Sequence, residues 1–416
     1  MRIRAEWNQL RSVIMHRPGV EIEYAMLAPK PFLFERSFRT SRAVEEHIGL
    51  ERTLHDNGVK VSILKDEIVR RANDSSEFRR GLEERVEQNA MFYGEIAHTE
   101  LARKDFFRNI HGLDAENLFH FLTLEPSVDL KKTESLQYPT IYSNIPLANL
   151  YFMRDQQIVS SDGVVIGSMR SLQRRKETEI TYFFFSQVFG NGAVKRVSEG
   201  FLEGGDYMPA GDFAMFGIGP RTDLAGVMSA LKTGNVVFDE YCIVENPVYE
   251  FMEGTTRDPM INMHLDTYFN LAGEGLAVGS ISLLSRAKAT IYARNGSSVE
   301  KISETTFLDY LKTKGYNIID LSIKEQLSYS SNFLTISDRK IVAVNSSEVL
   351  KRLVSSGVFS DGVLNAMRSD STDEKNAFPN GKRARDYGLD VIQVDLSELT
   401  GGYGGAHCMT AAVKRG

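Results

Sequence analysis

Cysteine is scarce in this chain of 416 residues, which contains only Cys242 and Cys408. Two cysteines so far apart in sequence provide no disulfide framework, and without a CxxC pair they form no zinc-binding motif. A chain of this length can bury a large core without such help, as one domain with an insertion or as two domains. A reducing environment suits it best, so we expect a cytoplasmic protein.

An excess of positive charge and a long apolar run are also lacking. The formal net charge is -6, from 49 basic and 55 acidic residues. Their signs are mixed along the chain, so no electrostatic field is set up to hold a polyanion. The first residues, MRIRAEWNQLRSVIMHR, contain no apolar signal core, and no stretch approaches membrane-spanning length. We therefore expect neither nucleic acid nor a membrane as a partner.

Short strands and helices alternate along most of the chain. Residues 11–17 predict a strand, and residues 42–64 predict an amphipathic helix followed by a strand. Hairpins are predicted at residues 156–169 and 332–347, around Asp162-Gly163 and Asp338-Arg339. Further helices are predicted at residues 176–190, 222–234 and 305–316. This pattern indicates mixed α/β structure rather than a doubly wound sheet, and no sequence repeat is visible.

Residues 66–136 differ in character from the rest of the chain. They are dense in helix formers, and their apolar residues recur at three-and-four spacing. We therefore divide the chain into an α/β catalytic domain, residues 1–65 and 137–416, and an inserted helical domain, residues 66–136.

A glycine-rich segment, LTGGYGGAHCMT, leads to Cys408 near the C-terminus. Glycines allow a loop to bend and a ligand to approach closely, as an exposed nucleophile would require. A reactive thiolate also needs a neighbouring cation or histidine. His407 is adjacent, but adjacent side chains usually diverge. From this segment alone, a small buried structural cysteine is the more frequent explanation.

Three more polar clusters lie upstream, and each also has an ordinary structural explanation. INMHLDTYF alternates like a strand, which would put His264 and Asp266 on one face. LEGGD is typical of a turn and contains two acidic residues. In NLYFMRD, polar residues flank a short apolar run. Together they supply a base and several carboxylates without metal-ligand spacing. With a cysteine, that set suits a planar cation such as a guanidinium, which carboxylates bind in bidentate geometry. The residues are His264 and Asp266, Glu203 and Asp206, and Asn149, Arg154 and Asp155.

These segments resemble, in the same chain order, the motifs of the arginine deiminase family of guanidino-group-modifying enzymes. The resemblance runs from about Arg11 to Met409 and includes LRSVIMHRPG, EEHIGLERTLHDNGVKV, NLYFMRD, SMRSLQRRKET, LEGGD, GPRTD, MHLDTYF and GGAHCMT. It implies a pentein fold, a five-fold pseudosymmetric α/β propeller of ββαβ modules, with the helical insertion that deiminases carry. It also implies hydrolysis of L-arginine to citrulline and ammonia through a cysteine thiouronium, with no metal or organic cofactor.

The resemblance also implies roles for particular residues. Cys408 would be the nucleophile and His264 the general acid/base, with Glu203 beside that histidine. Asp155 and Asp266 would hold the guanidinium. The α-carboxylate of the substrate would be bound by Asn149, Arg174 and Arg221, with Arg175 as a rival to Arg174.

Two positions depart from the family's pattern. Tyr403 stands where deiminases carry an arginine in the Gly-rich loop, and we include it among the substrate-binding candidates. The segment Phe34-Glu35-Arg36-Ser37 replaces an acidic LFDD motif. We hypothesise that the two changes are coupled and alter gating or the substrate, which requires Tyr403 to lie near this segment and the cleft.

Three alternatives to an arginine deiminase remain open. An amidinotransferase would pass the amidino group to an amine, and it would need a second, amine-binding pocket. A hydrolase or dihydrolase would act on arginine or another guanidino compound. A non-catalytic homologue would only bind such a ligand. The sequence does not fix the oligomeric state, although acidic α/β enzymes of this size are often homo-oligomers.

Overall fold

The computed structural model describes residues 3–94, 96–132, 137–249, 262–296, 298–372 and 376–416. Within them, five groups of three strands share one pattern. The first strand pairs antiparallel with the second strand, and the third strand pairs parallel with the second strand. A parallel pair requires a crossover, and helical segments provide it in each group. Each group is therefore a ββαβ module, and the expected α/β propeller is confirmed. The modules are β6–β7–β8, β9–β10–β11, β12–β13–β16, β17–β18–β19 and β20–β1–β2.

The strands of the modules are short. Their bounds are β1 Leu10–Met15, β2 Lys60–Ile63, β6 Gln157–Val159, β7 Val164–Ile166, β8 Val194–Arg196, β9 Tyr207–Ala210, β10 Phe213–Ile218, β11 Glu240–Glu245, β12 Phe269–Gly273, β13 Leu276–Gly279, β16 Asn317–Asp320, β17 Leu334–Ser337, β18 Lys340–Val344, β19 Asp390–Val394 and β20 Ala411–Arg415. A hairpin of β14 Lys288–Asn295 and β15 Ser298–Thr306 extends the second module's sheet, because β14 pairs with β11.

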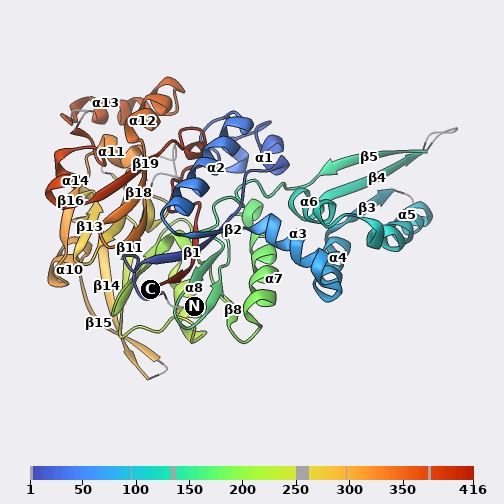
Figure 1. The fold of residues 1–416 in the computed structure, drawn as a ribbon, viewed down its shortest axis with the longest axis horizontal. Coiled ribbons are helices and arrows are strands. Elements are labelled where there is room, and N and C mark those ends of the chain that lie inside the picture. The colour runs from blue at the N-terminus through green and yellow to red at the C-terminus, as the bar shows by residue number, and fades with distance from the viewer. Residues whose placement is uncertain (1–2, 95, 133–136, 250–261, 297, 373–375) are drawn as a thin grey trace.

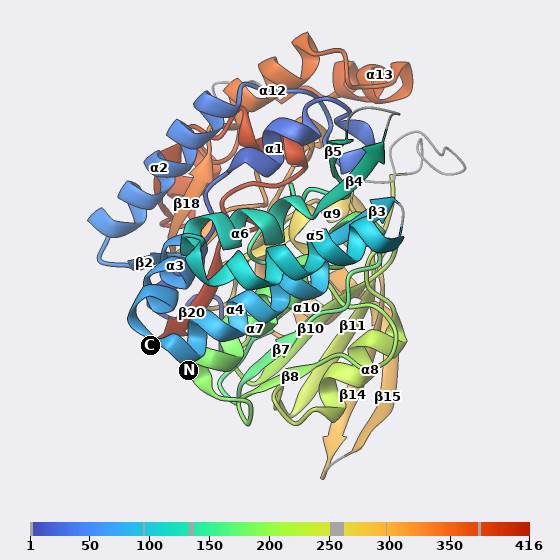
Figure 2. The same cartoon turned by 90° about the vertical axis from the view of Figure 1, so that its right-hand side faces the viewer.

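Helices cover the outside of the modules, as Figures 1 and 2 show. Their bounds are α1 Val20–Ala25, α2 Thr40–Asp56, α7 Glu177–Phe189, α8 Leu224–Lys232, α9 Ile281–Leu284, α10 Phe307–Thr313, α11 Ile323–Leu327, α12 Ser346–Ser355, α13 Asp361–Ser369 and α14 Lys382–Asp386. None of the helices in the described ranges is long and apolar enough to cross a bilayer.

Most elements predicted from the sequence are present. Both hairpins form as β6–β7 and β17–β18, and the helix and strand predicted within residues 42–64 are α2 and β2. The predicted strand around His264 and Asp266 is wrong, because a 3₁₀ turn, Leu265–Thr267, follows His264 and β12 begins only at Phe269. Two bonds hold this turn: the backbone N–H of Leu265 donates to Asp206, and the Thr267 hydroxyl donates to the carbonyl of His264.

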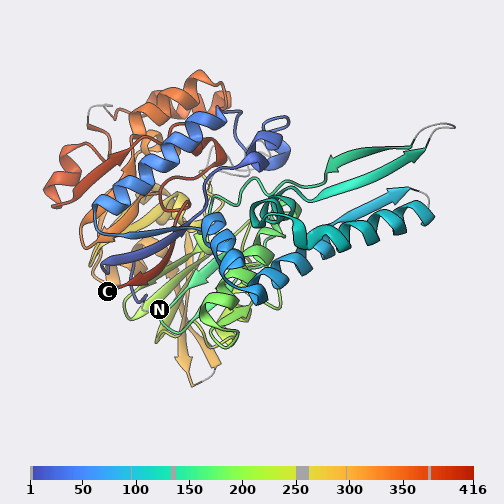
Figure 3. The same ribbon diagram turned by 45° about the vertical axis from the view of Figure 1, so that its right-hand side comes forward.

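The segment inserted between β2 and β6 extends as an arm from the modules (Figure 3). Besides helices it contains a three-stranded sheet, β3–β4–β5, whose last strand lies beyond the predicted end of the inserted domain. That predicted end, residue 136, lies outside the described residues, and the division into two domains stays a prediction. The elements are α3 Leu64–Asp74, α4 Ser76–Asn89, β3 Met91–Gly94, α5 Ile96–Asn109, α6 Ala115–Leu124, β4 Pro126–Lys132 and β5 Gln137–Ser143.

The two ends of the chain meet where the ring of modules closes. Strand β20 pairs antiparallel with β1, and the N and C labels lie close together in Figures 1 and 2. Beneath this pair the Glu6 carboxylate, 1% exposed, lies 2.7 Å from Arg415 and 3.2 Å from Arg154. Burial would raise the pKa of Glu6, but the charges of Arg415 and Arg154 outweigh it and lower that pKa well below its usual range. The three side chains form a buried ion cluster that ties both ends of the chain to the first module.

Replacement of Glu6 tests how much this cluster contributes to stability. Glu6→Gln leaves two buried guanidinium groups without a counter-charge, so we expect the free energy of unfolding to fall by about 3 kcal/mol. Urea denaturation followed by circular dichroism measures the change. The control is Glu45→Gln, because Glu45 pairs with Arg42 at the surface, where a pair contributes less than about 1 kcal/mol. Equal losses in the two variants would contradict a special role for the buried cluster.

Candidate active site

The loops that lead into β6, β12 and β20 meet in one buried pocket, together with residues that follow β7 and β10 and with Leu33. Its volume is about 10 Å³, room for a single water molecule. A substrate therefore requires the pocket to widen. The lining residues are Leu33, Asn149, Phe152, Asp155, Arg174, Arg221, Met263, His264, Gly402, Tyr403 and Cys408.

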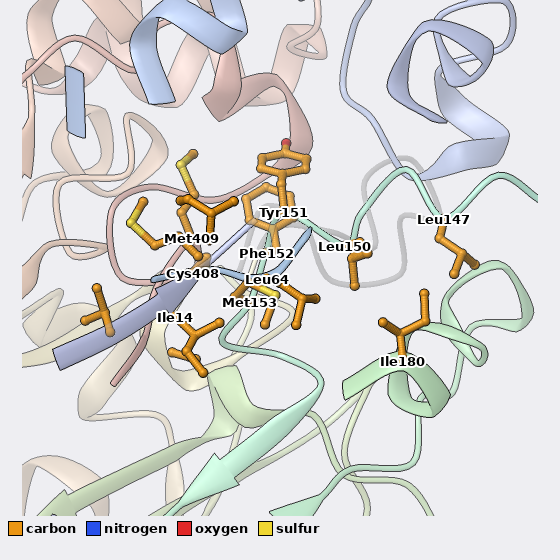
Figure 4. Packing of buried hydrophobic residues seen from close by; sticks show 14 of the residues in the cluster. Ile14, Leu64, Leu147, Leu150, Tyr151, Phe152, Met153, Ile180, Cys408 and Met409 are labelled. Atoms are coloured by element: carbon orange, nitrogen blue, oxygen red, sulfur yellow. The ribbon is translucent and has the colours of Figure 1, made fainter. Parts of the chain in front are cut away.

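Cys408 lies at the base of this pocket in an apolar environment, 3% exposed. Figure 4 shows it beside Met409 and Phe152 in the hydrophobic core. Its thiol donates to Asp266 Oδ2 at 3.3 Å. Burial, and then the charges of Asp266 and Asp155, raise the pKa of the thiol well above its usual value. Cys408 is therefore a neutral thiol at neutral pH.

His264 sits between two carboxylates. Its Nε2 atom is 3.0 Å from Glu203 Oε2, and its Nδ1 atom is 3.8 Å from Asp155 Oδ1. Burial lowers the pKa of His264, but the charges of Asp155, Asp206 and Glu203 outweigh it and raise that pKa to about 9. The imidazole is therefore protonated at neutral pH and can donate a proton.

Gly205 makes the close packing around His264 possible. A Cβ atom at this position would lie 2.7 Å from His264 Nδ1 and 3.1 Å from Asp155 Oδ1. Any side chain here would force the histidine and the carboxylate apart, which explains why glycine separates Glu203 from Asp206 in the LEGGD segment.

Two carboxylate oxygens in the site lack hydrogen-bond donors within the described residues. Asp155 Oδ2 accepts from Arg174 at 2.7 Å, and Asp266 Oδ2 accepts from His407 and Cys408. The second oxygen of each carboxylate, Asp155 Oδ1 and Asp266 Oδ1, is buried and has no such partner. A buried acceptor without a donor is costly, so both atoms favour a ligand that carries N–H groups.

Arg174 is ion-paired within the site rather than exposed. It contacts Glu177 at 2.9 Å and lies 3.7 Å from Glu203, in addition to its bond with Asp155. Burial alone would lower the pKa of this arginine, but the surrounding carboxylates raise it, so the guanidinium stays charged. The rival residue Arg175 is exposed and does not line the pocket.

The other substrate-binding candidates also lie at the pocket. Arg221 approaches Glu203 at 4.0 Å and donates to the hydroxyl of Ser171. Asn149 donates to the carbonyl of Phe32 at 2.8 Å, which joins the first module to the segment before α2. Seven of the nine residues named from the sequence line the pocket. The other two, Glu203 and Asp266, contact His264 and Cys408 directly.

The two departures from the family pattern lie next to each other. Tyr403 lines the catalytic pocket with Leu33, and it lines an adjoining cavity of about 20 Å³ with Glu35. The backbone N–H of Glu35 donates to the carbonyl of Gly401 at 2.7 Å. Tyr403 and Glu35 are therefore close enough for the two changes to be coupled. An effect of these changes on gating or on the substrate stays a hypothesis.

Sequence reasoning missed two contributors to the site. His407 was set aside because adjacent side chains diverge, yet its Nδ1 atom is 2.8 Å from Asp266 Oδ2, the oxygen that also contacts Cys408. Asn332 contacts the Cys408 sulfur at 3.1 Å. No motif marks Asn332, and the signal that could have found it is its position just before a module's first strand, β17.

Asp155, Glu203 and His264 could also be considered as metal ligands, because their donor atoms lie within 4.8 Å of one another. The positive charge of Arg174 already lies 2.7 Å from Asp155 and 3.7 Å from Glu203. A protonated imidazole cannot coordinate a metal. We therefore interpret the three residues as an ion-pair network, and the absence of a metal requirement stays a prediction.

The propeller of ββαβ modules, with a buried thiol, a histidine and carboxylates where its loops converge, defines the class: a pentein-fold member of the guanidino-group-modifying superfamily. Three solved structures share the fold at low sequence identity. An amidinotransferase of the saxitoxin pathway from Microseira wollei is 12% identical, with a TM-score of 0.54 over 100% of this chain and 97% of that one. A dimethylarginine dimethylaminohydrolase from Pseudomonas aeruginosa is 14% identical, with a TM-score of 0.51 over 97% and 98%. AgrE, in complex with ornithine and NAD+, is 13% identical, with a TM-score of 0.53 over 97% and 39%.

Sequence comparison identifies the family within this class. The model of the arginine deiminase family matches residues 30–415, and the chain belongs to that family. Arginine deiminases of Halobacterium salinarum and Borrelia recurrentis are each 26% identical over 99% of this chain, covering 96% and 97% of their own lengths.

The electrostatic origin of the His264 pKa can be tested by titration. Glu203→Gln removes one of the anions that stabilise the imidazolium, so we expect the pKa of His264 to fall from about 9 by about one unit or more. NMR of histidine ring signals against pH measures it. Glu199→Gln, at an exposed position nearby in sequence, should leave the titration unchanged. A His264 pKa that is insensitive to Glu203 would show that the carboxylate is not what holds the proton.

The neutral state of Cys408 predicts slow alkylation of the protein alone. Iodoacetamide reacts with the thiolate, so the rate should be low at pH 7 and rise steadily above pH 9. Asp266→Asn removes a neighbouring anion, and we expect it to raise the rate constant at pH 8 by about tenfold. Mass spectrometry of the modified peptide distinguishes Cys408 from Cys242. Rapid alkylation of the unchanged protein at pH 7 would contradict the raised thiol pKa.

Proposed function

We propose that this protein hydrolyses L-arginine to L-citrulline and ammonia. The observation that carries the proposal is the pair of buried acceptors, Asp155 Oδ1 and Asp266 Oδ1, next to the Cys408 thiol. A guanidinium has N–H groups on both sides of its central carbon, so it can satisfy both carboxylates at once. The relatives named arginine deiminase, which align over nearly the whole chain, support the same substrate.

Binding of the guanidinium would also activate the nucleophile. The carboxylates that raise the Cys408 pKa would then be paired with the substrate's charge, which removes much of their repulsion on a thiolate. The Cys408 thiol would lose its proton to water, and the resulting thiolate would attack the guanidinium carbon and form a tetrahedral adduct. Protonated His264 would give its proton to the leaving nitrogen, and ammonia would depart as the C–N bond breaks.

A second half-reaction would release the product. The first step leaves a thiouronium between Cys408 and the substrate carbon, and His264, now neutral, can accept a proton from water. The resulting hydroxide would attack the same carbon. As the C–S bond breaks, the proton of the new hydroxyl group would pass to the sulfur, so that citrulline leaves and the neutral Cys408 thiol is restored, with His264 again protonated. Every group in this scheme is a side chain of the pocket, substrate or water.

The far end of arginine would lie on the cationic side of the pocket. Arg221, Arg174 and Asn149 line the pocket, and two guanidinium groups with an amide would suit an α-carboxylate. Leu33 and Tyr403 also line the pocket, and we propose that they move apart to admit the substrate. The coupled departures at Tyr403 and Glu35 would act at this point, on gating or on the choice of a close arginine relative. A homo-oligomeric state and a cytoplasmic location stay predictions.

The direct test is to incubate the pure protein with L-arginine, without metal or added amine, and to assay citrulline, ammonia and ornithine together. We expect citrulline and ammonia in equal amounts. Ornithine with two equivalents of ammonia would indicate a dihydrolase. Product formation only after an amine is added would indicate an amidinotransferase, and no turnover of any guanidino compound would leave a binding protein.

Two variants test the roles of individual residues. Cys408→Ala should abolish turnover while leaving the fold intact, because Cys408 is the one thiol in the pocket lining. Asp155→Asn replaces a charged acceptor by a neutral amide and should lower kcat/KM by roughly 100-fold, or about 3 kcal/mol. Steady-state kinetics with circular dichroism as the folding control measure both. Unchanged kinetics in Asp155→Asn would show that this carboxylate does not hold the substrate.

A further inference from the structure

The five modules place polar residues at equivalent positions, just before their first strands. Asp155 precedes β6, Asp206 precedes β9, Asp266 precedes β12 and Cys408 precedes β20. The remaining module begins with β17, and Asn332 occupies the corresponding position before it. No role for this module in the reaction follows from the sequence motifs.

Asn332 uses its whole amide to hold the nucleophile loop. Its Oδ1 atom accepts from the backbone N–H of Gly405 at 2.8 Å and of Cys408 at 3.1 Å. Its Nδ2 atom donates to the carbonyl of Asp266 at 3.1 Å and to the Cys408 sulfur at 3.1 Å. Because the two backbone groups can only donate, the oxygen must face them, and the NH₂ group must face the sulfur.

We propose that Asn332 is a catalytic residue that donates a hydrogen bond to the Cys408 thiolate as it forms and attacks. The proposal rests on the nucleophilic role proposed above for Cys408. The fourth module, β17–β18–β19, would then contribute a side chain to the reaction, as the other modules do.

The surroundings of the sulfur show why such a donor matters. The other polar group in contact with it is the carboxylate of Asp266, which opposes a negative charge on sulfur. Among the described residues, Asn332 makes the one N–H contact to the sulfur for which a hydrogen bond is observed. A hydrogen bond to an ionised acceptor is roughly twice as strong as one between neutral groups, so this bond strengthens as the thiolate forms. The donation lowers the thiol pKa against the effects of burial and the carboxylates.

Asn332 is itself held rigidly, as a preorganised donor requires. The side-chain amide of Asn270 on β12 donates to the carbonyls on either side of it, Ser331 at 2.9 Å and Phe333 at 2.7 Å. The carbonyl of Asn332 accepts from the backbone N–H of His407 at 3.2 Å. Asn332 is fully buried and does not line the substrate pocket, so it acts on the nucleophile and not on substrate binding.

Substitution by aspartate separates this role from a merely structural one. Asn332→Asp keeps an oxygen for the two backbone N–H groups, and so keeps the loop, but it replaces the donor to sulfur by a second oxygen. We expect the alkylation rate constant of Cys408 at pH 9 to fall at least about tenfold. We also expect kcat for arginine to fall roughly 10- to 100-fold, with KM little changed.

Asn235→Asp is the matched control, because Asn235 is a buried amide that donates to the carbonyls of Val164 and Ala193 away from the site. It should cost stability and leave both rates unchanged. Asn332→Ala, which introduces no charge, is the second variant if Asn332→Asp fails to fold, and it should lower the alkylation rate and kcat in the same direction.

The proposal is overturned if a folded variant has an alkylation rate constant and a kcat within twofold of those of the unchanged protein. Asn332 would then only anchor the loop. Alkylation needs no substrate. A protein that failed to turn over arginine would therefore still report on the bond between Asn332 and sulfur, and the two proposals can fail separately.

Discussion

The burial of charge where the modules meet is the constraint on which the rest of the structure depends. Glu6 lies between Arg154 and Arg415, and Arg174 lies between Asp155 and Glu177. A buried charge without its partner costs several kcal/mol, so each of these residues fixes the positions of the others. The partners of Glu6 come from segments far apart in sequence, so these pairs close the ring of modules. Arg174 and its partners belong to the first module and hold its loops in the site.

These compensated charges leave the pocket with a specific deficit. Asp155 and Asp266 each have one oxygen that accepts a hydrogen bond, from Arg174 and from His407 respectively. Their second oxygens, both Oδ1, are buried and have no donor in the described residues. The thiol between them is neutral, because burial and the same carboxylates raise its pKa. A flat cation with several N–H groups would satisfy both carboxylates and offset their charge at once, which supports the proposed guanidino substrate.

The fold explains why the chemistry is divided among distant segments. Each module brings its first strand toward the same centre, so the residues just before β6, β9, β12, β17 and β20 converge although they span more than half of the chain. Asp266 Oδ2 accepts from both Cys408 and His407, and Asn332 holds the loop of Cys408 from the neighbouring module. The departures at Tyr403 and Glu35 lie beside this centre, where both residues line one adjoining cavity.

The sequence by itself determined most of the local helices and strands and identified the polar residues of the candidate site. Turn chemistry at Asp162-Gly163 and Asp338-Arg339 predicted both hairpins, amphipathic spacing predicted α2, and ordered motifs predicted the family and nine site residues. Tertiary structure alone decided the 3₁₀ turn after His264, the choice of Arg174 over Arg175, and the parts of His407 and Asn332. The physical reason is that these outcomes depend on partners from other modules. The backbone N–H of Leu265 donates to Asp206 and is therefore not available to pair in a strand. Asn332, just before β17, contacts the Cys408 thiol only when the modules close into a ring.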